Sequence, residues 1–230
     1  MPSSKTSSPV LLRCKGVLFD MDGILISSIE SVERSWTRWA LMRGVDPVRA
    51  CEVAHGRRGV DSIAILRPDF EPEAETRIIE GFEIEDTAGV AGLPGVLALL
   101  AILPAQSWTV VTSATEKLAR VRLAAGGIPA PERMVTAESV SAGKPDPAPY
   151  LAGAALLGLR PEECVVFEDA AAGAQAGRAA GCTVVATTFS HSIESLAAAH
   201  YLIDDLSAVE VIASRGGAEL ELSFTPLASL

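Results

Sequence analysis

Two carboxylates two residues apart follow an apolar run near the start of the chain. The run is Val17-Leu18-Phe19, and the carboxylates are Asp20 and Asp22, followed by Gly23. A continuous apolar run is typical of a buried strand in a parallel sheet, and open α/β sheets bind ligands at the carboxyl ends of such strands. Strand geometry would direct both carboxylates to one face, where they repel each other unless a cation or a reaction uses them. The alternative is a polar strand end with a turn at Gly23.

Three later segments also carry polar residues of particular types. Ser113 precedes a predicted helix, where a hydroxyl and free N–H groups can bind an anion, although an ordinary N-cap fits equally. Lys144 stands between a glycine and a proline and could supply a fixed positive charge; the alternative is a solvated loop lysine. Glu168 and Asp169 end another apolar run and would suit a hard cation, although helix N-termini also favour acids.

The elements that must position these residues alternate between strand and helix. Besides the strand before Asp20, strands are predicted at 107–112, 133–136, 164–167, 182–186 and 201–203, with an edge strand at 219–224. Helices are predicted at 94–103, 116–125, 149–157 and 170–180. This alternation is typical of βαβ units, so we expect an α/β fold with a doubly wound, Rossmann-like parallel sheet.

The segment between the first strand and this alternating region has a different pattern. Apolar residues from Ile29 to Trp39 recur at helical spacing, Gly44 provides a C-cap, and Asp46-Pro47 starts the next helix. Short helices are also predicted at 61–66 and from Glu71 to Glu85. We therefore predict a core domain of residues 10–27 and 88–230, and an all-helical insert of residues 28–87, which we call the insert.

Composition narrows the range of partners. The chain has 230 residues, 49% of them hydrophobic, and a formal net charge of -10. Without a run of Lys or Arg, nucleic acid and anionic membrane surfaces are disfavoured as partners. No apolar run approaches the ~18 residues needed to cross a bilayer. A small anionic ligand would need a local site, and a monomer or small homo-oligomer is expected.

The cysteines and the N-terminal segment favour a cytoplasmic location. Cys14, Cys51, Cys164 and Cys182 form no CxxC pair, and we expect them to be reduced. The segment Met1–Pro9 is rich in serine and lacks the apolar region of a secretory signal. We expect it to be a disordered tail.

The order and types of the polar residues resemble the four motifs of the haloacid dehalogenase superfamily. Asp20-Met21-Asp22-Gly23 resembles the first motif, Ser113 the second, Lys144 the third and Glu168-Asp169 the fourth. Residues 141–147 and 167–170 look like the sugar-phosphatase branch, which includes 2-deoxyglucose-6-phosphate and glycerol-phosphate phosphatases. The insert is similar to the small helical cap of that family. The resemblance covers about residues 15 to 205.

This resemblance implies roles for the first two carboxylates. Asp20 would attack phosphorus and form an aspartyl-phosphate. Asp22 would protonate the leaving alcohol and then act as a base for water. The resemblance further implies a Mg²⁺ site made by Asp20, the backbone carbonyl of Asp22, Glu168 and Asp169. Ser113, with Ala114, and Lys144 would hold the phosphoryl oxygens.

The implied activity is Mg²⁺-dependent hydrolysis of a small phosphorylated metabolite, either a sugar or a polyol phosphate. One alternative is a sugar phosphomutase, because mutases use the same four motifs. A second alternative is a non-catalytic regulator that binds a phosphorylated ligand, although such a protein is expected to have lost a motif residue. Assays of free phosphate and of isomerised sugar phosphate would distinguish these possibilities.

The insert contains one basic loop with two possible roles. The loop could reach towards a substrate, or it could be a surface loop that pairs with acidic residues of the insert. Trp36 and Trp39 are expected to form the core of the insert, and His191 to be structural or solvated. The loop residues are His55, Gly56, Arg57 and Arg58.

Two positions depart from the family pattern. Ile24 stands where threonine is usual, and Ser27 stands where aspartate is usual in the segment leading to the insert. These departures affect a hinge detail and not the expected chemistry.

Overall fold

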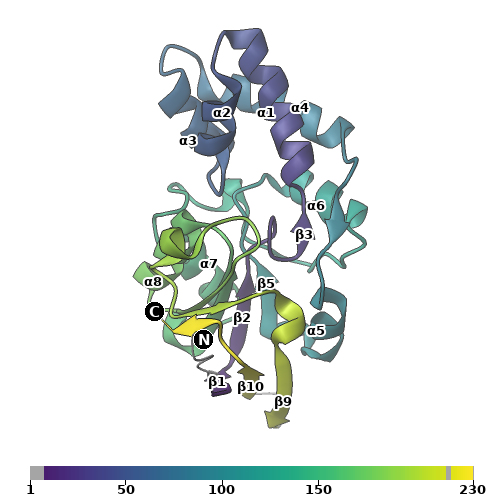
Figure 1. Ribbon diagram of the computed structural model, residues 1–230, viewed down its shortest axis with the longest axis vertical. Helices are drawn as coiled ribbons and strands as arrows, with labels where there is room; N and C mark the ends of the chain where they lie inside the picture. The colour runs from purple at the N-terminus through teal and green to yellow at the C-terminus, as the bar shows by residue number, and fades with distance from the viewer. Residues whose placement is uncertain (1–7, 216–218, 230) are drawn as a thin grey trace, which may run out of the picture.

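The computed structural model describes residues 8–215 and 219–229, so residues 1–7 of the expected tail lie outside the described residues. Six strands form the central sheet in the spatial order β11-β8-β7-β6-β2-β5 (Figure 1). Neighbouring strands from β8 to β5 are parallel, and β11 is antiparallel to β8. The predicted α/β fold is thus confirmed. The bounds are β11 Ala228–Ser229, β8 Tyr201–Ile203, β7 Thr183–Thr187, β6 Cys164–Glu168, β2 Gly16–Phe19 and β5 Trp108–Val110.

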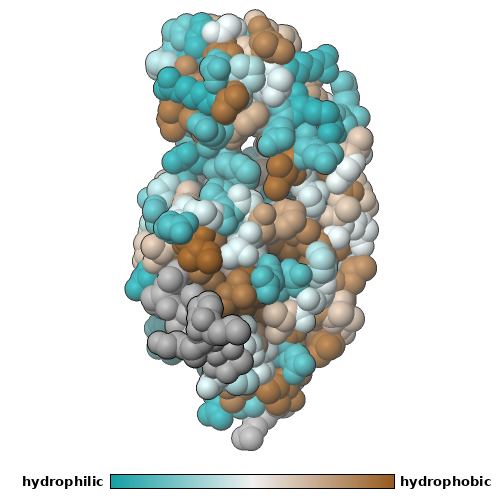
Figure 2. Space-filling model, viewed as in Figure 1, coloured by the Kyte–Doolittle hydropathy of each residue, from teal (hydrophilic) through white to brown (hydrophobic). Residues whose placement is uncertain are grey.

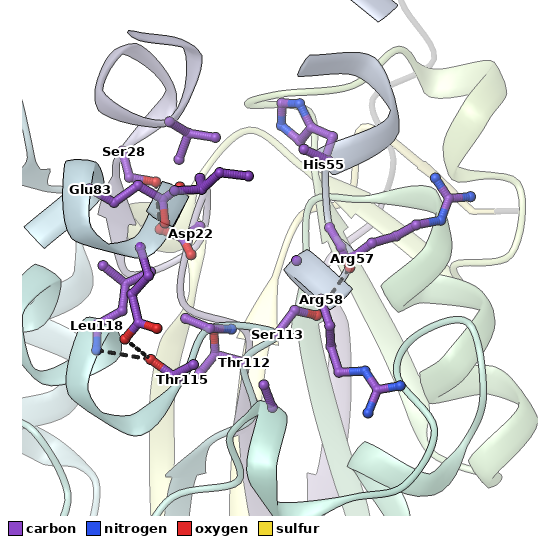
Figure 3. Close-up of a pocket in the computed structure, with 18 of the residues that line it drawn as sticks. Asp22, Ser28, His55, Arg57, Arg58, Glu83, Thr112, Ser113, Thr115 and Leu118 are labelled. Atoms are coloured by element: carbon purple, nitrogen blue, oxygen red, sulfur yellow. Dashed lines mark hydrogen bonds between the residues drawn. The ribbon is translucent and has the colours of Figure 1, made fainter. Parts of the chain in front are cut away.

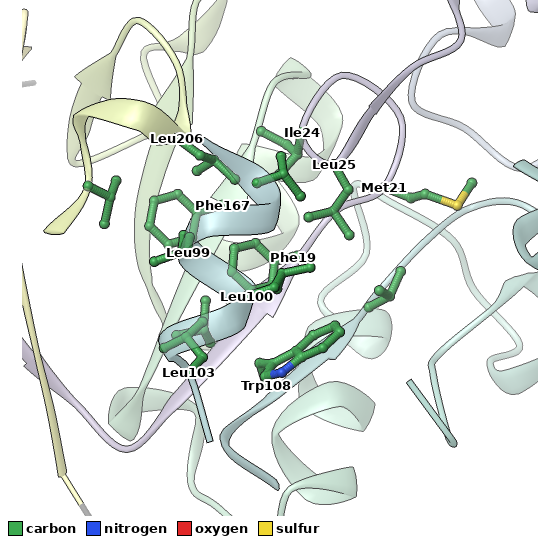
Figure 4. Close-up of a cluster of buried hydrophobic side chains, with 14 of the residues drawn as sticks. Phe19, Met21, Ile24, Leu25, Leu99, Leu100, Leu103, Trp108, Phe167 and Leu206 are labelled. Atoms are coloured by element: carbon green, nitrogen blue, oxygen red, sulfur yellow. The ribbon is translucent and has the colours of Figure 1, made fainter. Parts of the chain in front are cut away.

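Alternate residues of the buried strands pack on opposite faces of this sheet, as strand geometry requires. On one face, Phe19 of β2 and Phe167 of β6 stack at 5.4 Å and pack in one cluster with residues of α5 and α6 (Figure 4). On the other face, Leu18 and Val166 pack in one cluster with residues of α7 and α8. Helices therefore cover both faces, which explains the continuous apolar runs in sequence. The helices are α5 Val96–Ile102, α6 Glu116–Ala125, α7 Ala148–Leu156 and α8 Ala171–Ala180.

A second, antiparallel sheet lies at the end of the molecule opposite the insert (Figure 1). It consists of β1 (Val10–Cys14), β10 (Glu219–Phe224) and β9 (Glu210–Arg215), with β10 in the centre. The prediction of an edge strand at 219–224 was therefore wrong about its place, and β1 and β9 were not predicted. In β1 the exposed Leu11 interrupts the alternation of buried apolar and exposed polar residues that signals a strand.

The predicted strand at 133–136 is absent from the described structure. Val135 forms only an isolated bridge with Val111. The chain then turns into a short 3-10 helix at Ala137–Ser139, whose N-cap is Thr136, and this turn ends the extended stretch.

The insert is made of four helices joined to the core through a short ribbon. The helices are α1 Ile29–Arg43, α2 Pro47–Ala54, α3 Gly59–Leu66 and α4 Pro72–Glu85. The ribbon pairs β3 (Ile26–Ser27) with β4 (Ala91–Gly92) in antiparallel fashion and was not predicted. Trp36 and Trp39 lie edge-on at 5.7 Å in the insert's own apolar cluster, as expected. The proposed domain boundaries at residues 28 and 88 stay a prediction.

The surface of the insert is mostly hydrophilic on the face shown in Figure 2, and a narrow hollow appears where the insert meets the core. Within the described ranges, no helix combines the length and apolar character needed to cross a membrane.

Candidate active site

Lys144 forms the buried centre of the site. Its Nζ donates to Asp20 Oδ1 at 2.6 Å, to Glu168 Oε1 at 2.7 Å and to the Val111 carbonyl at 3.2 Å. These three bonds use every N–H of the ammonium, and the side chain is only 2% exposed. Burial lowers the pKa of Lys144, but the two carboxylates outweigh burial and raise it above its ordinary value. Lys144 is therefore a fixed positive charge and not a solvated loop lysine.

Asp20 follows β2 directly, and its backbone N–H donates to the Phe167 carbonyl at 2.9 Å. Its side chain is buried beside Lys144. The pKa of Asp20 is raised to about 7. Burial is the largest cause; Lys144 lowers the pKa and Glu168 raises it. A divalent cation bound nearby would favour the ionised carboxylate. Asp20 is thus placed as a carboxylate whose charge depends on the cations around it.

Glu168 is held entirely by protein groups. Besides Lys144, the Tyr150 hydroxyl donates to Oε1 at 2.7 Å, and the backbone N–H groups of Asp169 and Ala170 donate to Oε2. Gly173 permits this position, because a Cβ there would lie 1.6 Å from Oε1. Glu168 therefore orients Lys144 as well as belonging to the acidic group.

Asp169 completes a group of three buried carboxylates. One oxygen from each of Asp20, Glu168 and Asp169 lies within 4.8 Å of the others. Burial, Asp20 and Glu168 raise the pKa of Asp169 well above its ordinary value. Three carboxylates facing one ammonium leave excess negative charge, and oxygen donors are the ligands that hard divalent cations prefer. The donor set fits such a cation.

Gly23 connects the first motif to this acidic group. Its φ is +83°, and a Cβ built on it would lie 1.8 Å from Asp169 Oδ2. The turn after Asp22 therefore requires glycine both for its backbone conformation and for the close approach of Asp169.

Asp22 lies outside the three-carboxylate group and faces the cavity towards the insert. Ser28 Oγ donates to its Oδ1 at 2.5 Å, and Arg122 Nη1 donates to its Oδ2 at 3.0 Å. Its side chain is 31% exposed, far more than that of Asp20. This position suits a group that exchanges a proton with a substrate in the cavity.

The residues after β5 form the floor of the cavity (Figure 3). Thr115, and not Ser113, is the N-cap of α6 and accepts from Leu118 N at 3.3 Å. Ser113 Oγ instead donates to the Gly56 carbonyl of the insert at 3.1 Å, and Ala114 N donates to Thr112 Oγ1 at 3.1 Å. The hydroxyl of Ser113 is therefore available to a ligand once its contact with the insert opens.

The arginines of the basic loop point away from the cavity floor. Figure 3 shows the guanidinium groups of Arg57 and Arg58 directed away from Asp22 and Ser113. Arg58 pairs with Asp61 at 2.7 Å, as one of the two sequence-based alternatives predicted. It also donates to the core carbonyls of Val140 and Ser141 at 3.1 and 3.2 Å. Arg58 thus connects the insert to the core, and substrate recognition by this loop stays a prediction.

His55 of the same loop contacts the core near Asp169. Its ring lies edge-on to that of His191 with centroids 4.9 Å apart. Ser190 Oγ lies 2.7 Å from His191 Nδ1 and also donates to Asp169 Oδ2. His191 therefore lies beside the acidic group, and whether its role is structural stays a prediction.

Several site residues carried no signal in the sequence. Tyr150 and Ser190 contact the acidic group, while Ser28, Glu83 and Arg122 gather around Asp22. Glu83 and Arg122 lie on separate helices, α4 and α6, whose meeting depends on how the insert sits on the core. Spacing alone could not have indicated that meeting.

A family model of haloacid dehalogenase-like hydrolases matches residues 14–181 of the chain. The chain belongs to this family. The match includes all four motifs and the insert, and it confirms the resemblance drawn from the sequence.

The relatives include phosphatases of small metabolites. The chain is 45% identical to hexitol phosphatase A of Escherichia coli, over 76% of this chain and 83% of that protein. It is 38% identical to glycerol-1-phosphate phosphohydrolase 1 of Saccharomyces cerevisiae, over 80% of this chain and 79% of that protein. A hydrolase structure from Pseudomonas syringae superposes with a TM-score of 0.75 and 26% identity, over 84% of this chain and 94% of that one.

Proposed function

We propose that this protein is a Mg²⁺-dependent phosphatase that hydrolyses a small sugar or polyol phosphate through a phosphorylated Asp20. The observation that carries the proposal is the Lys144 ammonium, bonded to Asp20 at 2.6 Å and to Glu168 at 2.7 Å. This arrangement places a nucleophile, Asp20, beside a positive charge for phosphate, Lys144, and beside a carboxylate that can bind a cation, Glu168. The similarity to hexitol and glycerol-phosphate phosphatases supports the substrate class.

In the first step, an oxygen of Asp20 forms a bond to phosphorus as the ester P–O bond breaks. The Ser113 hydroxyl holds one phosphoryl oxygen, and Lys144 holds another once it releases the Val111 carbonyl. Asp22 gives its proton to the departing alcohol. A Mg²⁺ ion would be held by Asp20, Asp169, Glu168 and the Asp22 carbonyl. It would neutralise charge on the phosphoryl group.

In the second step, water attacks phosphorus and gives a proton to Asp22. The bond between Asp20 and phosphorus then breaks, which releases inorganic phosphate and restores the ionised Asp20. Asp22 must therefore be protonated in the first step and ionised in the second. Its half-buried position at the cavity, between Ser28 and Arg122, leaves it accessible for that exchange.

The cavity suits a small substrate. Its volume is about 260 Å³, and both the insert and the core contribute its walls. Asp20, Asp22 and Ser113 are among the residues that line it, and a phosphate group would bind beside them. The carbon chain of the substrate would then extend towards the insert.

A panel of phosphate esters with Mg²⁺ tests this proposal by release of inorganic phosphate. We expect turnover of polyol or sugar phosphates, and none above background from the Asp20→Asn variant with its fold intact. The exposed Asp204→Asn serves as the matched control and should retain activity. Substantial turnover by Asp20→Asn would contradict the role of Asp20. Isomerised sugar phosphate without free phosphate would instead indicate a mutase, and no turnover of any ester would indicate a binding protein.

A further inference from the structure

A buried ion pair joins the insert to the core beside Asp22. Arg122 of α6 is 4% exposed, and Glu83 of α4 is 6% exposed. Arg122 Nη2 lies 3.1 Å from Glu83 Oε1, while Arg122 Nη1 donates to Asp22 Oδ2 at 3.0 Å. The guanidinium therefore links a carboxylate of the insert to the proposed general acid.

This pair has hydrogen-bonding capacity that the described residues do not fill. Arg122 Nε is buried without a partner in residues 8–215 and 219–229, and Nη2 approaches Glu83 without forming a well-aligned hydrogen bond. Buried polar groups are rarely left in this state. Glu83 is a carboxylate in an equally dry position, and burial raises its pKa. Both side chains line the same cavity as Asp20 and Ser113.

Apolar side chains form much of the cavity wall, and the acidic residues Asp22 and Glu80 also lie near the pair. Figure 3 shows Glu83 next to Asp22 and Ser28, with Leu118 nearby on the same side of the cavity. Small-molecule sites fix the orientation of a ligand with a few polar groups placed in such apolar surroundings. The apolar residues lining the cavity include Ile29, Val32, Trp36, Ile79 and Leu118.

We propose that Glu83 and Arg122 bind a hydroxyl group on the carbon adjacent to the phosphate ester. The inference rests on the proposed function, in which Asp22 protonates the ester oxygen. Because Arg122 is bonded to Asp22, its free N–H groups lie one group beyond that oxygen along the substrate. A hydroxyl can accept from Arg122 and donate to Glu83 at the same time. The substrates would then be phosphate esters that carry a vicinal hydroxyl.

Two esters with the same carbon chain test this subsite. Glycerol 1-phosphate carries the vicinal hydroxyl, and propyl phosphate lacks it. For the wild type we expect kcat/KM to favour glycerol 1-phosphate by roughly 10- to 100-fold, because propyl phosphate leaves the buried pair without a partner. Glu83→Leu should reduce this preference to near one.

The matched control is Glu85→Leu on the same helix, since Glu85 is exposed and outside the cavity lining. It should keep the wild-type preference. Thermal unfolding of each variant checks that the fold is retained. If Glu83→Leu does not fold, Arg122→Met replaces it and should reduce the same preference, with an altered pH profile of kcat because Arg122 contacts Asp22.

The outcomes separate this inference from the proposed function. A wild type that hydrolyses both esters without preference contradicts the subsite alone. A folded Glu83→Leu that loses activity on both esters equally also contradicts it, because the pair would then only hold the insert in place. A wild type that releases phosphate from no ester contradicts the proposed function, and the subsite falls with it.

Discussion

At the scale of single residues, one ammonium group organises the site. Lys144 bonds to Asp20 and Glu168, and Glu168 is in turn fixed by Tyr150 and by backbone N–H groups. The position of the proposed nucleophile therefore depends on a chain of buried hydrogen bonds. Such networks are stabilising only when every member is satisfied.

Removing this ammonium should affect stability and activity together. Lys144→Met leaves Asp20 and Glu168 as unpaired buried carboxylates, so we expect the free energy of unfolding to fall by about 3–5 kcal/mol. Phosphate release should also be lost. Urea denaturation and the phosphate assay measure both effects. The exposed Lys117→Met is the control, and a similar small effect from both variants would contradict the central place of Lys144.

Mg²⁺ binding should depend on pH through Asp20. Burial raises the pKa of Asp20 to about 7, so this carboxyl is increasingly protonated below that pH. A cation must displace this proton and any proton on Asp169, whose pKa is raised as well, so we expect its apparent affinity to fall by about tenfold or more per pH unit below 7. Calorimetric Mg²⁺ titrations on either side of pH 7, in buffers of different ionisation enthalpy, measure affinity and released protons. Equal affinity without proton release would contradict the shifted pKa.

At the scale of elements, contacts between the insert and the core close the cavity. The insert is joined to the core by the β3–β4 ribbon, and Arg58 adds hydrogen bonds to the Val140 and Ser141 carbonyls. Ser113 contributes a further bond to the Gly56 carbonyl. We expect a substrate to enter through this junction, and these contacts to open and re-form during turnover.

Arg58→Met should favour the open arrangement of the insert. Loss of two hydrogen bonds is expected to lower kcat/KM by roughly tenfold, mainly through a higher KM. Small-angle scattering should show a larger radius of gyration than for the wild type. The exposed Arg49→Met, also in the insert, is the control. Unchanged kinetics and dimensions for Arg58→Met would show that these contacts do not hold the insert.

The elements that the sequence predicted correctly are those whose burial leaves a plain pattern. The runs before Asp20 and Glu168 are apolar on both faces because helices cover both faces of the sheet. Gly44 ends one helix and Asp46 begins the next, as expected. The strand at 133–136 was wrong because an extended pattern does not reveal that only Val135 finds a partner. The motif carboxylates could be found because they lie at the ends of buried strands, and Lys144 because it stands between a glycine and a proline. Glu83 and Arg122 could not, because their roles arise only where two distant helices meet.

At the scale of the whole molecule, the site and the antiparallel sheet lie far apart. The sheet of β1, β10 and β9 occupies the end opposite the insert (Figure 1). Leu222 of β10 is fully buried in the same apolar cluster as Phe19. This sheet thus extends the core without contributing to the cavity lining.

Leu222→Ala should therefore separate stability from activity. We expect the free energy of unfolding to fall by about 2–5 kcal/mol through the lost burial and the cavity left behind. At temperatures where the variant is folded, kcat/KM should match the wild type. Ser223→Ala, half-buried on the other face of β10, is the control for stability. A large loss of kcat/KM in folded Leu222→Ala would show that the two ends of the molecule are coupled.

The chain carries a net charge of -10, which repels an anionic substrate. Binding of such a substrate therefore depends on positive charge within the site itself. The central claim is that Asp20 carries the phosphoryl group during turnover. The most direct measurement is mass spectrometry of peptides from wild-type protein quenched in acid during hydrolysis of a substrate found in the ester panel. We predict a peptide heavier by one phosphoryl group, with the modification on Asp20 and absent from Asp20→Asn. A phosphoryl group on Asp22 or another residue, or active turnover that never yields a phosphorylated peptide, would contradict the account.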